Sequence, residues 1–252
     1  MTTFNNVLIL INSIKFKISI MREQLVKIAT KLGIYQQMVK IDTRHTEHLQ
    51  KKAMKRYGLQ TILEADAVVS DFGGHLFLVF GSLLGAYREH NFIPHDYDID
   101  MGLLSSERPD DMVSRMQDRG FKLIRQQYIK EIDRITEEQY SWNGVGIDIF
   151  YFFDDRNADE IYTYISYRHE TKDWREANVT DGFPAILKIL PSSTFIRQDF
   201  LGHPIYMPQD TEAWLKKLYG EHFMTPDPNW TLGDHKARAV PSQYRVYRRM
   251  FD

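Results

Sequence analysis

Two aspartates separated by a single residue, Asp98 and Asp100, constrain this chain more than any other feature of its sequence. Side chains alternate along a strand, so both carboxylates would lie on one face, with Ile99 on the other. Two adjacent buried carboxylates repel each other and are tolerated chiefly when one takes up a proton or both bind a hard cation such as Mg²⁺. The triplet therefore predicts a strand with a metal site on its polar face.

The segment before this pair predicts a phosphate-binding turn. An apolar run over residues 76–80 is typical of a buried strand, Gly81 and Ser82 interrupt it, and residues 83–89 favour a helix. The backbone N–H groups at the start of a helix suit a phosphate group. The alternative for Gly81 and Ser82 is an ordinary strand-to-helix turn, since glycine is common in such turns.

Three further side chains near this segment have competing interpretations. Arg88 would add a bidentate contact to a phosphate, or it would form a surface ion pair with Glu89 or Asp96. His95 would act as a base or contact phosphate, but a histidine in a loop after a proline is more often simply solvated. Asp96 has a similarly weak claim to a role.

A third acid lies within the apolar segment 145–153. Alternation places Asp148 beside Gly146 on one face of this strand and the apolar side chains on the other. Asp148 is either a third metal ligand, one member of a structural salt bridge with an arginine, or part of an edge strand with a solvated face. The pair at Asp98 and Asp100 favours the metal interpretation.

Four short motifs carry a resemblance to a known family. They read Gly-Ser-Leu-Leu-Gly-Ala-Tyr-Arg over 81–88, Phe-Ile-Pro over 92–94, Asp-Tyr-Asp-Ile-Asp over 96–100 and Ile-Asp-Ile-Phe over 147–150. Together they resemble the LicD-type phosphotransferases of the nucleotidyltransferase-like superfamily, which are similar to the animal fukutin and fukutin-related proteins. A supporting pattern from Phe200 to Pro228 extends the resemblance from about Leu59 to Trp230.

The resemblance implies a fold and a reaction. The fold would be α/β (α+β), a nucleotidyltransferase-like mixed sheet flanked by helices, with helical additions at both ends. The reaction would be the metal-dependent transfer of phosphocholine, ribitol phosphate or glycerol phosphate from a CDP-linked alcohol donor. The acceptor would be a hydroxyl of a cell-surface glycan or its lipid-linked precursor, as in lipopolysaccharide, teichoic acid or capsule polysaccharide.

The resemblance also assigns roles to six residues of this sequence. Donor phosphate would be bound by Gly81, Ser82 and Arg88. Catalysis and the binding of Mg²⁺ or Mn²⁺ would fall to Asp98, Asp100 and Asp148.

Two rival functions stay open at this point. One is a nucleotidyltransferase that uses an NTP to modify a small molecule or a protein, with the same three acids. The other is a non-catalytic domain of a larger glycan polymerase. The presence of all three acids argues against the second.

Composition excludes several other classes of protein. A net charge of -2 argues against general binding of nucleic acid, which needs a basic surface. The absence of cysteine excludes disulfides and cysteine-bound zinc. The apolar residues 7–20 are too short and too charged for a membrane-spanning helix and lack the pattern of a signal peptide. We expect a cytoplasmic protein, with peripheral contact at the inner face of the membrane through a lipid-linked acceptor.

The remaining segments predict an N-terminal helical or irregular extension, residues 1–58, and a LicD-like catalytic domain, residues 59–252. Within them the pattern predicts helices over 43–57, 59–69, 109–119 and 211–219, strands over 121–129 and 161–167, and a hairpin over 195–207. The basic tail after Asp234 reads as a solvated helix. The four tryptophans are expected in the core more often than at a sugar-binding surface.

Overall fold

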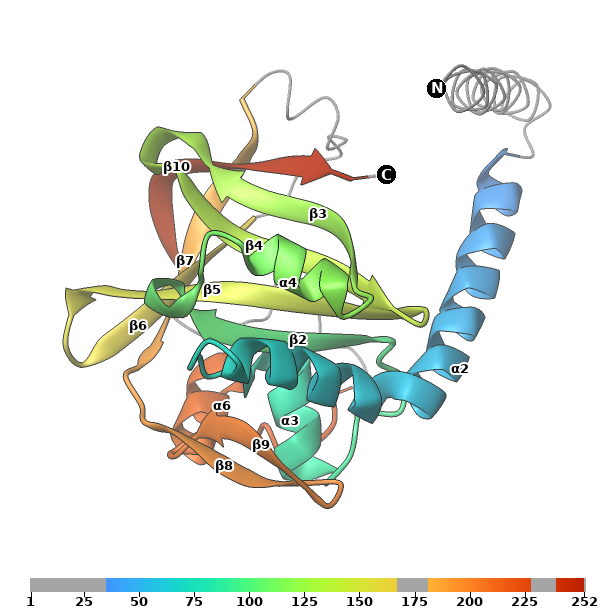
Figure 1. Cartoon of the computed structure of the whole chain (residues 1–252), viewed down its shortest axis with the longest axis horizontal. Coiled ribbons are helices and arrows are strands. Elements are labelled where there is room, and N and C mark those ends of the chain that lie inside the picture. The colour runs from blue at the N-terminus through green and yellow to red at the C-terminus, as the bar shows by residue number, and fades with distance from the viewer. Residues whose placement is uncertain (1–34, 167–180, 228–238, 252) are drawn as a thin grey trace. The chain divides into compact units, whose positions relative to one another are not determined.

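The computed structural model describes residues 35–166, 181–227 and 239–251 (Figure 1). The chain divides into two compact units, residues 1–49 and 50–252. In the first unit, the described residues form the beginning of helix α2. The sequence-based predictions for residues 7–20, Trp174 and Trp230 lie outside the described residues, and the domain boundary at 58/59 stays a prediction.

The second unit is built around a ten-stranded sheet. Its strands are β1 (Phe77–Leu78), β2 (Asp98–Leu104), β3 (Lys122–Ile129), β4 (Arg134–Trp142), β5 (Val145–Asn157), β6 (Glu160–Ser166), β7 (Phe183–Pro191), β8 (Phe195–Phe200), β9 (His203–Pro208) and β10 (Ala239–Met250). The helices are α2 (Tyr35–Ser70), α3 (Phe80–Arg88), α4 (Met112–Asp118) and α6 (Thr211–Tyr219), with short 3₁₀ turns η1 (Ser105–Glu107) and η2 (Lys130–Ile132).

The strand order is β4-β3-β10-β7-β6-β5-β2-β1-β9-β8, and an additional pairing of β4 with β5 closes six of these strands into a ring. The pairs β2–β5 and β1–β9 are parallel, and the others are antiparallel. The predicted mixed sheet of an α/β fold is therefore confirmed. Strand β5 pairs with β2, β4 and β6 and thus connects the ring to the rest of the sheet (Figure 1).

The C-terminal prediction was wrong, because the basic tail contributes strand β10 and not a helix. The first part of β10 pairs with β7 and its last part with β3. Two of its arginines have partners: Arg245 forms an ion pair with Asp181, in the turn before β7, and Arg249 lies over the ring of Tyr128 on β3. Val246, between them, is fully buried. Charge density alone did not reveal this strand, because the charges are satisfied by neighbouring strands.

Helix α2 is one continuous helix where the sequence predicted two. The predicted break falls near Gly58, but a Cβ atom there would lie only 3.1 Å from the Phe92 ring and from Met54 Sδ. The glycine thus permits close packing and does not end the helix. The helix ends at Ser70, just before Gly73, whose φ of +80° is the left-handed conformation that follows many helices.

Several other elements confirm the sequence-based predictions. Helix α6 has the predicted bounds, strand β3 and helix α4 lie within one to three residues of them, and β8 and β9 form the predicted hairpin. Trp214 is fully buried and donates a hydrogen bond from Nε1 to the carbonyl of Pro191, as expected of a core residue. The predicted strand over 76–80 is shorter, because α3 begins at Phe80.

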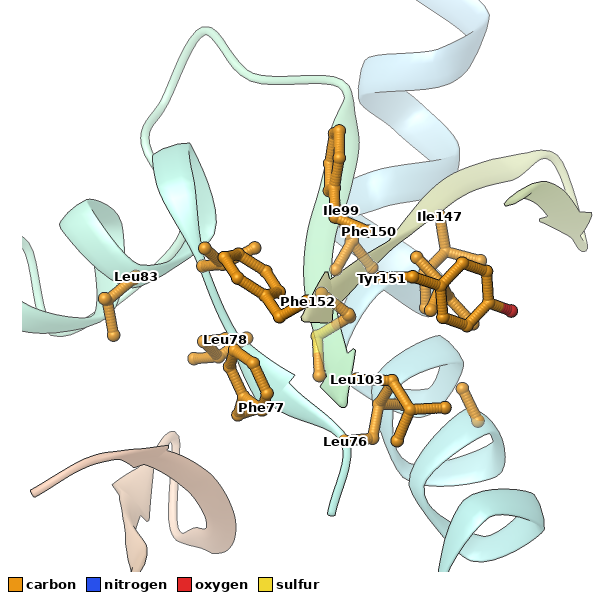
Figure 2. Packing of buried hydrophobic residues seen from close by; sticks show 14 of the residues in the cluster. Leu76, Phe77, Leu78, Leu83, Ile99, Leu103, Ile147, Phe150, Tyr151 and Phe152 are labelled. Atoms are coloured by element: carbon orange, nitrogen blue, oxygen red, sulfur yellow. The ribbon is translucent and has the colours of Figure 1, made fainter. Parts of the chain in front are cut away.

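The core divides between the two faces of β2 and β5. One face carries Asp98, Asp100 and Asp148 and is called the acid face below. The opposite face carries buried apolar side chains, among them Ile99, Leu103, Ile147 and Tyr151 (Figure 2). Helix α2 contributes to that side, where Tyr57 meets the ring of Trp142 edge-on. The apolar face of the strands thus anchors the sheet and leaves the acids on the other side.

Beyond the acids, the acid face is filled by aromatic rings. Phe77 of β1 stacks on Phe195 at 3.8 Å between ring centroids and meets Trp214 and Phe152 at 5.9 Å and 5.5 Å. A Cβ atom at Gly102 would lie only 2.2 Å from the Phe77 ring, so this position of β2 has no room for a side chain. These rings close one end of the acid face and leave the acids next to the start of α3.

Candidate active site

The acid face is organised by strand register. One row of directly paired residues crosses four strands: Arg125 of β3, Gln139 of β4, Asp148 of β5 and Asp100 of β2. In the neighbouring row, Asp98 pairs with Gly146. Because paired residues on adjacent strands point to the same face, the register brings together Asp100 and Asp148, which are 48 residues apart in sequence.

The start of helix α3 is tied to Asp100. The backbone N–H of Gly81 donates to Asp100 Oδ2 at 3.1 Å, and the Ser82 hydroxyl accepts from the Asp100 backbone N–H at 2.8 Å. Gly81 and Ser82 therefore lie in the first turn of the helix, and not in a turn before it. Phe80 has a φ of +47°, a conformation that is costly outside glycine and asparagine and that occurs often at functional sites.

Like charges dominate the electrostatics of the acids. Burial raises the pKa of Asp100 well above its usual value, and the charges of Asp98, Asp148 and Asp96 raise it further. Burial also raises the pKa of Asp98, while Arg125 opposes that shift. The carboxylates thus repel one another in a buried environment, and binding of a proton or a cation relieves that repulsion.

Asp148 has a charged partner. Arg125 Nη2 lies 3.1 Å from Asp148 Oδ2 and 2.7 Å from Glu137 Oε1. Burial raises the pKa of Asp148 to about 8, with a further contribution from Glu137, although Arg125 lowers it. The salt bridge left open as an alternative for Asp148 is therefore present, next to the acids that a metal site requires. Asp148 Oδ1 is buried and has no hydrogen-bond partner among the described residues.

We tested whether these residues fit a divalent cation. No three histidine or carboxylate side chains within the described ranges form a ready-made metal-ligand group. Yet Asp148 Oδ1 is an unpaired buried oxygen, and a Cβ atom at Gly81 would lie 3.2 Å from Asp96 Oδ2 and 3.3 Å from Asp100 Oδ2. Carboxylate oxygens are the ligands that Mg²⁺ and Mn²⁺ use. The donor chemistry therefore fits such an ion.

The other candidate residues lie at the edge of this cluster. Arg88 pairs with Glu89 at 2.7 Å and donates to the carbonyl of Phe223 at 3.2 Å; burial raises the pKa of Asp96, and the charge of Arg88 opposes that shift. This ion pair was the alternative interpretation of Arg88. His95 is well exposed and lies 4.0 Å from Asp96, as expected of a solvated loop residue.

Sequence reasoning missed three residues near the acids. Arg125 and Glu137 enter through the register of β3 and β4, and strand β4 was not predicted. Tyr219, at the end of α6, has its pKa raised by burial and by the charges of Asp100 and Asp96. The run of polar residues Glu137, Glu138 and Gln139 beside an apolar strand was the available signal for the missed neighbours.

Comparisons with known proteins agree with the resemblance. Residues 73–185 match the family model described as LicD/FKTN/FKRP, nucleotidyltransferase domain. The chain is 21% identical to ribitol-5-phosphate transferase FKTN of Macaca fascicularis over 182 residues, 72% of this chain and 36% of that protein. For the Mus musculus protein of the same name the identity is 23% over 166 residues, 66% and 33% of the two chains. The chain thus spans about a third of the length of these relatives.

None of the described helices is both long enough and apolar enough to cross a membrane. The expected peripheral contact with a membrane stays a prediction.

Proposed function

We propose, from the premise that residues 73–185 form a LicD-type nucleotidyltransferase domain, that this chain transfers a phosphorylated alcohol from a CDP-linked donor to a hydroxyl of a glycan. The observation that carries the proposal is the row in which Asp100 and Asp148 pair across parallel strands, with Asp98 in the next row. This row lies directly beside the first turn of α3. Transferases of this kind work chiefly by positioning and by neutralising charge.

Asp98 and Asp100 would hold Mg²⁺ or Mn²⁺, with Asp148 as the third carboxylate. A bound divalent cation supplies positive charge beside the donor diphosphate. Because the two relatives are ribitol-5-phosphate transferases by name, ribitol phosphate is the first group to test. The start of α3, with Gly81 and Ser82, lies next to Asp100, and Arg88 lies at the edge of the cluster near Asp96; all three would contact donor phosphate.

A residue of the chain would accept the proton that the acceptor hydroxyl loses during transfer. The bond between the two donor phosphates breaks and CMP leaves, while the acceptor hydroxyl forms the new bond to phosphorus and gives up its proton. With a cation bound beside it, Asp148 would lose the proton that its raised pKa favours and would then orient the hydroxyl or accept its proton. The membrane-bound or free state of the glycan acceptor is a separate question.

Calorimetry tests the donor. The protein is titrated with CDP-ribitol, CDP-glycerol, CDP-choline and the common NTPs, with and without Mg²⁺, beside an Asp98→Ala/Asp100→Ala variant and an Asp111→Ala control. Asp111 is an exposed acid that pairs with Arg115, away from the acid face. Metal-dependent binding of one CDP-alcohol that the double variant loses and the control keeps is the expected result.

Product analysis then separates this proposal from nucleotidyl transfer. Transfer of the alcohol phosphate releases CMP, whereas use of an NTP releases diphosphate. Release of diphosphate would move the assignment to a nucleotidyltransferase, and the absence of all nucleotide binding would favour a non-catalytic domain.

A further inference from the structure

Arg125 is a cation among the carboxylates of the acid face, and the proposed reaction does not use it. Arg125 extends from β3 across the paired Gln139 and reaches Asp148 two strands away. Its side chain is 20% exposed, against 8% for Asp148 and 6% for Glu137. A guanidinium so placed is largely desolvated, and it costs free energy unless its partners are held in good geometry.

Glu137 provides that geometry. Its Oε1 accepts from both Nε and Nη2 of Arg125, at 3.2 Å and 2.7 Å. Its other oxygen, Oε2, accepts from the side-chain amide of Gln127. Glu137 is thus fixed on both sides and fixes the guanidinium in turn.

The fixed guanidinium of Arg125 in turn orients the carboxylate of Asp148. Arg125 engages Oδ2, and Oδ1 is left buried without a hydrogen bond. The charge of Arg125 also acts on Asp98, the neighbouring acid on β2. One cation therefore touches or influences two of the three proposed functional carboxylates.

We infer that Arg125 is a positioning residue, held in place by Glu137, which orients Asp148 and offsets part of the negative charge of the acid face. This inference rests on the proposed function for its kinetic effects, but not for its effect on cation binding. It assigns Arg125 and Glu137 to one unit, in which Glu137 acts through Arg125.

The inference predicts that loss of the Arg125 charge changes Mn²⁺ affinity and turnover in opposite directions. In Arg125→Met the acid face is more negative, so Mn²⁺ should bind about tenfold more tightly, while turnover should fall by about a hundredfold because Asp148 is no longer oriented. A residue that merely stabilised the fold would weaken both. Arg125→Lys keeps the charge but lacks the planar guanidinium that can donate to two carboxylates at once. It should leave Mn²⁺ affinity within about twofold of the original value and reduce turnover.

A double-mutant cycle tests whether Glu137 acts through Arg125. Glu137→Gln alone should lower turnover by about tenfold, and it should have no further effect in the Arg125→Met background. Arg134→Met and Asp155→Asn are matched controls, since this ion pair also joins β4 to β5 but lies away from the acids. Neither control should change Mn²⁺ affinity or turnover.

The experiment is Mn²⁺ titration by electron paramagnetic resonance on the substrate-free chain, followed by steady-state kinetics with the CDP-alcohol found by calorimetry. Circular dichroism confirms that each variant is folded, and Arg125→Lys replaces Arg125→Met if the latter is not. Unchanged or weaker Mn²⁺ binding in Arg125→Met, or additive effects in the cycle, would overturn the inference. A chain that transfers nothing but shows the tighter Mn²⁺ binding would refute the proposed function and support this inference.

Discussion

Two buried carboxylates on neighbouring strands, Glu138 and Asp148, lie on opposite faces of the same sheet and have contrasting surroundings. Glu138 is fully buried and accepts hydrogen bonds from four side chains: Arg108, Gln126, Tyr140 and Tyr151. Asp148 has one charged donor, an unpaired oxygen and other acids beside it. The first arrangement surrounds the carboxylate with donors and holds strands together, whereas in the second the like charges favour a proton or a cation.

This difference separates structural polar residues from functional ones better than burial does. Burial and Glu138 together raise the pKa of both Tyr140 and Tyr151, which keeps their hydroxyls protonated as donors. On the acid face, burial and like charges raise the pKa of Asp100 and thereby favour a proton or a cation. A strongly shifted pKa occurs on both faces, and unpaired buried oxygens occur elsewhere, as at Asp66 Oδ1, so the discriminating observation is the set of like charges around Asp100.

The largest expected effect is on turnover at Asp148. Asp148→Asn should reduce transfer by at least about a thousandfold, because a neutral amide neither binds a cation strongly nor takes up a proton. The fold should persist, since the substitution removes one of several repelling charges. Steady-state kinetics and thermal unfolding of the same preparation check both statements. Near-normal turnover would show that Asp148 belongs with Glu138 as a structural acid.

The next effect is on stability at Glu138. Glu138→Ala leaves the Arg108 guanidinium and three neutral donors without their acceptor, and it should lower the free energy of unfolding by about 3–5 kcal/mol. Urea denaturation measures the loss. A cost below about 1 kcal/mol would remove the contrast between the two faces. Glu138→Gln keeps part of the network and should cost less.

A pH series sharpens the comparison. The pKa of Asp148 is raised to about 8 in the folded chain, so the folded state binds a proton that the unfolded state releases between about pH 4 and pH 8. Stability in EDTA should therefore fall by more than about 1 kcal/mol as the pH rises through this window. Asp148→Asn should flatten the slope, as measured by urea denaturation at pH 5 and pH 8. An unchanged slope would mean that Asp148 does not carry the proton.

The smallest expected effect concerns another charge, Lys188 of β7. Its backbone pairs with that of Thr163 in the sheet, and its side chain is almost fully buried. Burial lowers its pKa to about 8, so folding releases a proton and stability should rise from about pH 8 to pH 10. Lys188→Met should stabilise the chain at pH 7 by about 1 kcal/mol and abolish that rise. A loss of turnover in this variant would instead indicate substrate contact.

The sequence was sufficient for the local part of the site. Alternation placed Asp98 and Asp100 on one face, and apolar spacing placed Asp148 on a strand beside them. It was not sufficient for Arg125 and Glu137, because their proximity depends on the register of β3 and β4 against β5. Likewise, the charges of β10 concealed a strand because their partners, Asp181 and Tyr128, lie far away in sequence. Long-range pairing, and not local propensity, decided these cases.

The parallel register of β2 and β5 has a consequence for how this chain tolerates changes in length. A strand side chain returns to its original face only after two residues, so inserting one residue between Asp98 and Asp100 would turn one carboxylate into the apolar core. The β8–β9 turn at Gly202 has open space around it and imposes no such rule. A library of single-residue insertions should therefore be depleted along β2 and the first half of β5 and well represented at that turn.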